Sequence, residues 1–174
     1  STDYVFDGEK MSSYSEEDGT NPLSVYGKTK LQGEEAIKKS KCKYLIFRTS
    51  WLYGAHGKNF FKTIMKLAKE RDELRVVNNQ IGAPTSAELV ADVTSLCLDK
   101  IAQNSYSSKE ISDIYHLTAT GKASWYDFAK YAITEAKKSG GVFLTNPENI
   151  IAINASEYVL PAKRPENSLL DTQK

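Results

Sequence analysis

The chain has little of several features that mark specialised protein classes. Its 174 residues include only two cysteines and two histidines, too few for a disulfide framework or a zinc-type cluster. The net charge is +1, which gives no sign of nucleic-acid or anionic-membrane binding. No apolar run approaches the roughly 20 residues that span a bilayer. We therefore expect a globular protein of the reducing cytoplasm, without nucleic-acid or membrane partners.

Apolar runs and helical stripes alternate along the chain. Strands are predicted at about residues 4–6, 44–47, 74–77, 114–117 and 150–153. Helices are predicted at about residues 24–39, 59–70, 86–102 and 124–139. This alternation is typical of an α/β fold with a parallel sheet, in which ligands bind beyond the carboxyl ends of the strands. The loops after residues 6, 49 and 77 are thus the expected places for chemistry.

Polar residues mark two helix starts and one loop. Thr85 with Glu88, and Ser124 with Asp127, have the spacing of a capping box. Segment 9–22 is polar and contains turn formers, so we expect a surface loop there.

Tyr26 and Lys30 stand four residues apart in a predicted helix, so they share one face. Such a pair suits carbonyl reduction, because a nearby ammonium makes a phenol a better acid at neutral pH. The phenol can then give a proton to a carbonyl oxygen as hydride reaches the carbon. By itself the pair is weak evidence, since random placement in this composition yields about one such pair.

A second pair with the same spacing, Tyr126 and Lys130, has to be told apart from the first. On a helical wheel Lys30 falls on a small and apolar side with Gly33 and Ile37, where an unpaired lysine is costly. The second pair flanks an apolar stripe and is predicted to point to solvent. A lysine that snorkels at the helix edge stays open as an alternative for Lys30.

Five stretches of the chain add a more specific signal by their order. They are residues 1–8 (STDYVFDG), 26–34 (YGKTKLQGE), 48–54 (RTSWLYG), 80–85 (QIGAPT) and 164–171 (RPENSLLD). Together they resemble the extended short-chain dehydrogenase/reductases, and within them the dTDP-4-dehydrorhamnose reductases. The resemblance runs from residue 1 to about residue 171.

The resemblance implies a catalytic role for three residues. Thr2 would hydrogen-bond the substrate carbonyl, Tyr26 would be the proton donor, and Lys30 would hold the nicotinamide ribose beside Tyr26. The implied reaction is hydride transfer from NADPH or NADH to the 4-keto carbon of dTDP-4-dehydro-L-rhamnose. An ordinary strand threonine is the plainer alternative for Thr2.

The resemblance also implies substrate contacts. Asp3 and Trp51 match positions that line the sugar pocket, and an indole face can pack on the apolar C–H face of a sugar. Arg164 would lie near the diphosphate of the substrate. A core residue is the plainer alternative for Trp51, and a surface residue for Arg164. Some relatives are described with Mg²⁺, but one carboxylate, Glu88, predicts no metal site here.

The glycine-rich turn with which this family holds its dinucleotide does not occur in residues 1–174. The chain thus resembles the later part of such an enzyme. Residues 1–73 would form part of a Rossmann-like sheet and residues 74–174 mainly a smaller substrate-binding α/β lobe, with the helix near 86–103 packing back on the first part. We expect this chain alone to be inactive. We also expect an exposed sheet edge at residues 3–6 that pairs copies into a homo-oligomer or loses order.

Two other functions stay open. One is another extended reductase or an epimerase of nucleotide sugars; a 4,6-dehydratase is disfavoured because Thr2 is followed by Asp3 and Tyr4 rather than by an acidic pair. The other is a non-catalytic subunit like the regulatory subunit of methionine adenosyltransferase, which resembles these reductases. A binding protein of that kind can keep Tyr26 and Lys30.

Overall fold

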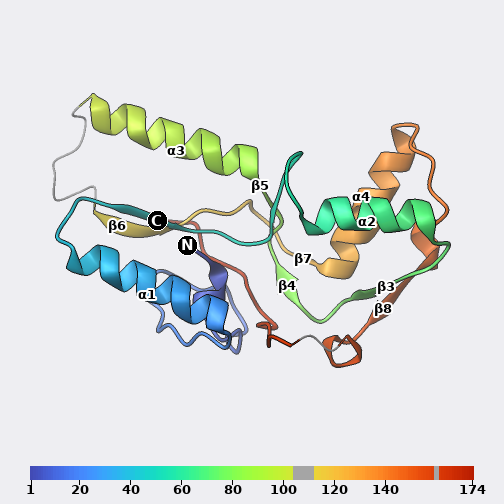
Figure 1. The fold of residues 1–174 in the computed structure, drawn as a ribbon, viewed down its shortest axis with the longest axis horizontal. Coiled ribbons are helices and arrows are strands. Elements are labelled where there is room, and N and C mark those ends of the chain that lie inside the picture. The colour runs from blue at the N-terminus through green and yellow to red at the C-terminus, as the bar shows by residue number, and fades with distance from the viewer. Residues whose placement is uncertain (104–111, 159–160) are drawn as a thin grey trace.

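The computed structural model describes residues 1–103, 112–158 and 161–174. Its longer helices and strands form two groups, with short strands between them (Figure 1). The predicted α/β class is confirmed. Among the described residues, three of the four strand pairs are parallel.

The first group contains α1 (Val25–Lys39), α3 (Ala87–Ala102) and a parallel pair of strands, β1 (Leu45–Arg48) and β6 (Asp113–His116). The helix α1 packs on a 3₁₀ turn, η1 (Asp3–Val5), near the N-terminus. One apolar cluster buried in this group is formed by Val5, Phe6, Tyr14 and Leu170, and Ile46 of β1 and Ile114 of β6 are buried as well.

The second group contains α2 (Phe60–Glu70), α4 (Trp125–Lys138) and another parallel pair, β3 (Leu74–Val77) and β8 (Ile150–Ile153). The two helices pack on one another and α4 lies against both strands. Their shared core is formed by Ile64, Ala68, Leu74, Val76, Ala129, Ile133 and Ile150. The predicted division at residue 73 stays a prediction; α2, which precedes it, packs on α4, which follows it.

Pairs of two-residue strands lie between the groups (Figure 1). The strand β2 (Leu52–Tyr53) runs parallel to β5 (Thr85–Ser86), and β4 (Ile81–Gly82) runs antiparallel to β7 (Ala123–Ser124). Two 3₁₀ turns flank β8, namely η2 (Pro147–Asn149) and η3 (Ala155–Glu157).

The local predictions hold for the long elements. Ser24 caps α1 by accepting a hydrogen bond from the Gly27 backbone N–H. The capping box of Ser124 and Asp127 at the start of α4 is confirmed in both directions. The hydrogen bonds at these two helix starts join residues close in sequence, which is why the sequence pattern indicates them.

The strand predicted at residues 4–6 is wrong. The Thr2 side chain accepts a hydrogen bond from the Tyr4 N–H, which curls the chain into η1. Within residues 1–6, only Thr2 pairs as in a sheet, through an isolated parallel bridge to Thr49. Val5 and Phe6 are buried inside the first group. Residues 3–6 therefore form no exposed sheet edge, and pairing between copies stays a prediction.

The predicted capping box of Thr85 and Glu88 is also wrong. Ser86 caps α3, accepting from the Leu89 N–H. Thr85 lies in β5, fully buried, and donates its hydroxyl to the Ala83 carbonyl oxygen. The Thr85 hydroxyl is thus hydrogen-bonded to the chain before β5 and does not cap α3.

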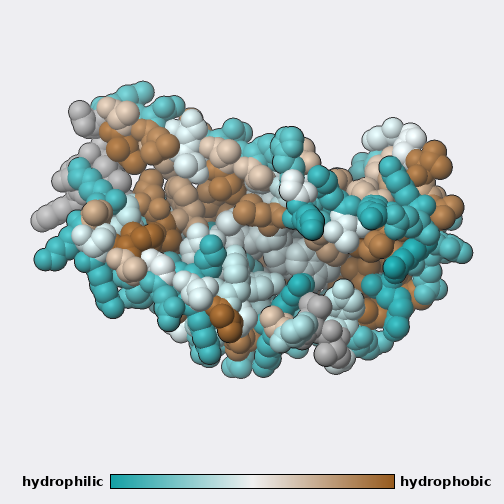
Figure 2. Space-filling view, viewed as in Figure 1, coloured by the Kyte–Doolittle hydropathy of each residue, from teal (hydrophilic) through white to brown (hydrophobic). Residues whose placement is uncertain are grey.

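The helix α3 leaves its apolar residues only partly covered. It buries none of them, and Leu96 and Leu98 are 60% and 58% exposed. Figure 2 shows apolar surface on this side of the molecule, over α3 and the adjoining sheet. Within residues 1–103, 112–158 and 161–174, no helix combines the length and the apolar character needed to cross a membrane. The predicted packing of this helix on a Rossmann part stays a prediction.

Candidate active site

A cavity of about 250 Å³ opens where η1, the start of α1 and the segment after β1 meet. It brings together four of the six residues that the sequence predicts for the site: Thr2, Asp3, Tyr26 and Trp51. Of the three predicted loops, the one after residue 49 contributes Ser50, Trp51 and Leu52, whereas the loops after residues 6 and 77 contribute no lining residue. Tyr4 and Trp125 also line the cavity, and the sequence analysis did not place either of them there.

Thr2 and Asp3 are both buried at the base of this cavity. The Thr2 hydroxyl donates to Asp3 Oδ1 at 2.9 Å and accepts from the Tyr4 N–H at 3.3 Å. The backbone N–H of Asp3 donates to the Thr49 carbonyl oxygen at 3.1 Å, which fixes η1 to the end of β1.

Burial dominates the electrostatics of Asp3. Removal of the carboxylate from water raises the pKa of Asp3 to about 7, although the hydrogen bond from Thr2 and the nearby Ser168 side chain oppose this shift. Its Oδ2 atom has no hydrogen-bond partner among the described residues. Burial also raises the pKa of Tyr4 to about 12, with a further contribution from the charge of Asp3. Tyr4 therefore stays protonated at neutral pH.

Tyr26 and Lys30 lie on one exposed face of α1. Tyr26 is 52% exposed, and its ring meets that of Tyr4 edge-on with centroids 6.0 Å apart. The Lys30 ammonium lies 5.7 Å from the centroid of the Tyr26 ring. No ion pair joins Lys30 to a carboxylate in the described part of the chain. Both groups are therefore free to meet a ligand above the helix.

The predicted burial of this face is wrong. The side of α1 that packs inward carries Gly27, Leu31 and Glu34, whereas Lys30 is exposed and Ile37 is 43% exposed. The reason is a buried ion pair, which outweighs the small apolar side that the wheel favours. Glu34 receives hydrogen bonds from Arg48 Nε at 3.0 Å and Nη2 at 2.7 Å.

This ion pair connects α1 to β1. Burial alone raises the pKa of Glu34, but the hydrogen bonds from Arg48 and Ser1 and the Arg48 charge outweigh it, so the pKa lies below its ordinary value. Arg48 also lies over the Phe6 ring, at 5.1 Å from its centroid. The pair holds the helix that carries Tyr26 at a fixed place beside η1. The sequence analysis missed it, although Glu34 and Arg48 both lie within the recognised motifs.

Gly27 allows α1 to approach η1 closely. A Cβ atom at this position would stand 2.2 Å from the Tyr4 carbonyl oxygen. We expect Gly27→Ala to force the helix away and to lower the free energy of unfolding by about 1–3 kcal/mol in urea denaturation.

Gly33 on the same helix is the matched control, because nothing lies within 4 Å of a Cβ added there. Gly33→Ala should raise stability by roughly 0.5–1 kcal/mol through helix propensity. Equal effects of the two substitutions would contradict the close approach at Gly27.

Trp51 lies in the cavity wall but is mostly enclosed. Its backbone is in the left-handed region, with φ of 49°. Its indole stacks on Trp125 at a centroid distance of 3.4 Å and an angle of 3°, and a Cβ at Gly82 would lie 2.4 Å from it. The two indoles join the first group of elements to α4. One face of Trp51 is thus unavailable to a sugar, and Trp125 shares the cavity wall.

Arg164 does not line the cavity. It is exposed, and its charge lowers the pKa of Tyr4 against the larger effect of burial. Arg164 therefore lies close enough to the site for its charge to act on Tyr4. The second tyrosine–lysine pair has the same 5.7 Å ring distance but lies on α4, where Tyr126 packs partly on the core of the second group and Lys130 is exposed. Its predicted solvent orientation is thus correct for the lysine only.

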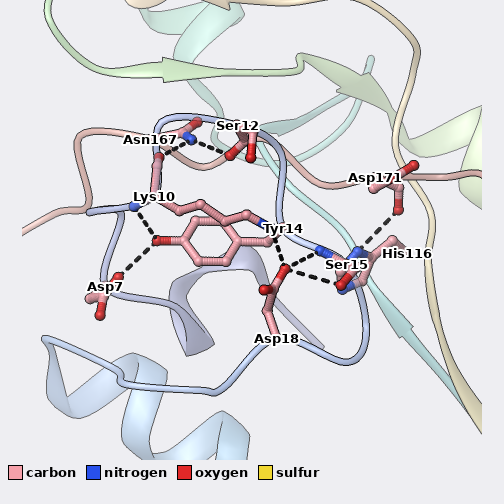
Figure 3. Close-up of polar contacts among 9 residues, drawn as sticks. All are labelled: Asp7, Lys10, Ser12, Tyr14, Ser15, Asp18, His116, Asn167 and Asp171. Atoms are coloured by element: carbon pink, nitrogen blue, oxygen red, sulfur yellow. Dashed lines mark hydrogen bonds and ion pairs between the residues drawn. The ribbon is translucent and has the colours of Figure 1, made fainter.

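Segment 9–22 is not simply a surface loop, because Tyr14 within it is buried. Tyr14 stacks on Phe6 at 4.3 Å, and its hydroxyl donates to Asp7 Oδ1 at 2.8 Å (Figure 3). The C-terminal segment binds the same loop, with Asn167 donating to the carbonyl oxygens of Lys10 and Ser12 (Figure 3). These contacts hold Phe6, which follows η1, and Leu31 of α1 packs on the same cluster.

Comparison with known proteins finds the resemblance to the dTDP-4-dehydrorhamnose reductases along the whole chain. The model of the RmlD substrate binding domain matches residues 1–174. The dTDP-4-dehydrorhamnose reductase of Escherichia coli (strain K12) is 48% identical over 174 residues, which are 100% of this chain and 56% of that protein. This chain therefore spans about half the length of the curated relatives it matches.

Solved structures agree with this match. The dTDP-4-dehydrorhamnose reductase of Bacillus anthracis, in complex with NADP, superposes with a TM-score of 0.82 at 37% identity, over 99% of this chain and 56% of that one. A reductase of the same description from Clostridium acetobutylicum gives 0.80 at 42% identity, over 98% and 55%. With its whole length matched by the family model, the chain belongs to the RmlD substrate binding domain family.

Proposed function

We propose that this chain carries the substrate site and the proton donor of an enzyme that reduces the 4-keto group of dTDP-4-dehydro-L-rhamnose to dTDP-L-rhamnose. The observation that carries the proposal is the single cavity shared by Thr2, Asp3 and Tyr26, with Lys30 beside Tyr26. The relatives named as dTDP-4-dehydrorhamnose reductases support the choice of substrate.

The chain's own residues would handle the substrate oxygen. The Tyr26 phenol opens to the cavity from α1 and can give its proton to the carbonyl oxygen. The Thr2 hydroxyl, on the η1 side, can donate a hydrogen bond to the same oxygen once its hydrogen is not held by Asp3. Trp51 and Trp125 would bound the sugar, and Arg164 at the rim would meet the diphosphate.

The exposed face of α1 fits a nicotinamide cofactor. The Lys30 ammonium is a triple hydrogen-bond donor on the face of Tyr26, which suits the hydroxyl groups of a ribose. When bound, NADPH or NADH supplies the hydride. The absence of a glycine-rich turn in this chain means that the pyrophosphate needs residues from another part of the protein. We propose no metal site, and no group of three metal-ligating side chains is found among the described residues.

We further propose that the whole protein acts in the cytoplasm and takes a nucleotide sugar as its partner molecule, with homo-oligomers formed outside the cavity. The division into a Rossmann part at residues 1–73 and a substrate lobe at 74–174 belongs to the same proposal. The 174-residue chain is expected to be inactive by itself.

The test is an assay of the full-length protein, in which a dinucleotide-binding part accompanies this chain. Purified protein is mixed with NADPH and dTDP-4-dehydro-L-rhamnose, and the sugar product is identified by NMR. We expect dTDP-L-rhamnose with equimolar loss of NADPH, and no product from the 174-residue chain alone. A full-length protein that consumes no NADPH with this substrate would overturn the proposal and favour a non-catalytic binding subunit.

A further inference from the structure

The Thr2 hydroxyl group is committed to protein partners in this structure. It donates its only hydrogen to Asp3 Oδ1 at 2.9 Å, and its oxygen accepts the Tyr4 N–H at 3.3 Å. While that hydrogen is held by Asp3, Thr2 can offer the cavity a lone pair but no donor. A carbonyl oxygen in the cavity needs a donor, so this arrangement cannot bind it through Thr2.

Asp3 is surrounded by groups that do not neutralise it. Tyr4 on its own turn and Tyr26 from α1 line the same cavity, Thr49 follows β1, and Ser168 faces it from the C-terminal segment. Ser1 lines the same cavity and its N-terminal ammonium donates to the Phe47 carbonyl oxygen, whereas the charge of Arg164 acts on Tyr4. Among the described residues no cation forms an ion pair with Asp3.

Both protonation states of this carboxyl group are accessible near neutral pH. Asp3 is 3% exposed, and its Oδ2 atom is buried without a partner. Burial without a counter-ion is the cause of its raised pKa, about 7. A bound substrate would remove more water from the cavity and favour the protonated form further.

We propose that Asp3 is a positioning residue whose proton decides where the Thr2 hydroxyl points. When Asp3 is protonated, its own O–H donates to Thr2 Oγ1, and the Thr2 hydrogen is released toward the cavity. When Asp3 is ionised, its Oδ1 atom again accepts the hydrogen bond from the Thr2 O–H, and Thr2 presents no donor to the cavity. The inference rests on the proposed function, because the acceptor it serves is the carbonyl group of that substrate.

The kinetic test compares Asp3→Asn with the wild type in the full-length reductase. For the wild type, kcat/KM should fall about tenfold per pH unit above about pH 7, as the carboxyl group ionises. In Asp3→Asn the amide N–H donates to Thr2 at every pH, so activity should persist and this decline should be absent. A Thr2→Val background should lower activity and make the pH profile insensitive to Asp3→Asn.

Two kinetic outcomes would overturn the inference. One is an Asp3→Asn enzyme that keeps the wild-type decline above pH 7. The other is an enzyme that loses activity equally at every pH, which indicates a role in packing or direct substrate binding alone. Rescue of high-pH activity by the asparagine is therefore the diagnostic result.

An independent measurement uses the full-length protein without any substrate. The ¹³C signal of the Asp3 carboxyl group should titrate near pH 7, and Thr2→Val should move that midpoint upward, because a donor to the carboxylate is lost. A midpoint near the ordinary value of about 4 would overturn the inference even if the reductase is active. If the full-length protein reduces no nucleotide sugar, the proposed function fails, while this titration still decides whether Asp3 controls Thr2.

Discussion

Tyr26→Phe should lower kcat of the full-length reductase by about 100-fold or more, with a much smaller change in KM. The substitution removes the phenolic oxygen and leaves the ring that meets Tyr4 edge-on at 6.0 Å. Packing of α1 on η1 should thus survive, while the proton for the carbonyl oxygen has no donor. The measurement is the initial rate of NADPH oxidation at saturating dTDP-4-dehydro-L-rhamnose.

The chain contains its own control for this result. Tyr126 and Lys130 have the same spacing and the same 5.7 Å distance between ammonium and ring centroid, but they lie on α4, and neither lines the cavity. Tyr126→Phe should leave kcat within about threefold of the wild type. Should Tyr26→Phe prove equally harmless, Tyr26 is not the proton donor and the proposed mechanism fails.

Glu34→Gln should lower the free energy of unfolding by about 3–5 kcal/mol. The substitution leaves the Arg48 guanidinium charged, 2% exposed and without its bidentate partner. An unpaired buried charge is the costliest outcome, which makes this the largest stability effect we expect. Chemical denaturation monitored by circular dichroism measures it. Because α1 carries Tyr26 and Lys30, reductase activity of the full-length variant should fall as well.

Glu35→Gln, one residue further, is the matched control. Glu35 is exposed and its 3.6 Å contact with Lys38 lies at the surface, so its loss should change stability by less than about 1 kcal/mol.

The ion pair of Glu34 with Arg48 also predicts a pH effect on stability. The pKa of Glu34 is lower in the folded than in the unfolded chain. The contribution of Glu34 to the free energy of unfolding is therefore present above about pH 4.5, and it is lost as the pH falls through the pKa of Glu34 in the folded chain. A wild-type stability that does not decline in acid more steeply than that of Glu34→Gln would contradict this.

Local patterns were sufficient for the long elements of this fold. The apolar stripes and caps predict α1, α2 and α4 because a helix depends on residues three or four apart. The four-residue strands follow from short apolar runs between turn formers. The spacing of Tyr26 and Lys30 likewise places both on one face of a helix, and the structure confirms this. None of these features needs information from distant parts of the chain.

Where local preference and burial disagree, burial decides. Tyr4 and Val5 favour a strand by composition, yet the Thr2 side chain caps a turn that buries Val5 and Phe6. The wheel of α1 favours its small, apolar side, yet the adjacent side, on which Glu34 meets Arg48, is the one that is buried. In both cases the deciding contact is a hydrogen bond to a polar side chain, which hydrophobic periodicity does not detect.

The sequence by itself determined the α/β class, the positions of the long helices and the shared helix face of Tyr26 and Lys30, because these depend on neighbours along the chain. Only the tertiary structure decided which face of α1 is buried, that Trp51 stacks on Trp125, and that Asp3 is enclosed beside Thr2 without a counter-ion. These features depend on residues brought together from distant segments. The protonation of a carboxyl group follows from the water and charges around it, and those are set only when the chain has folded.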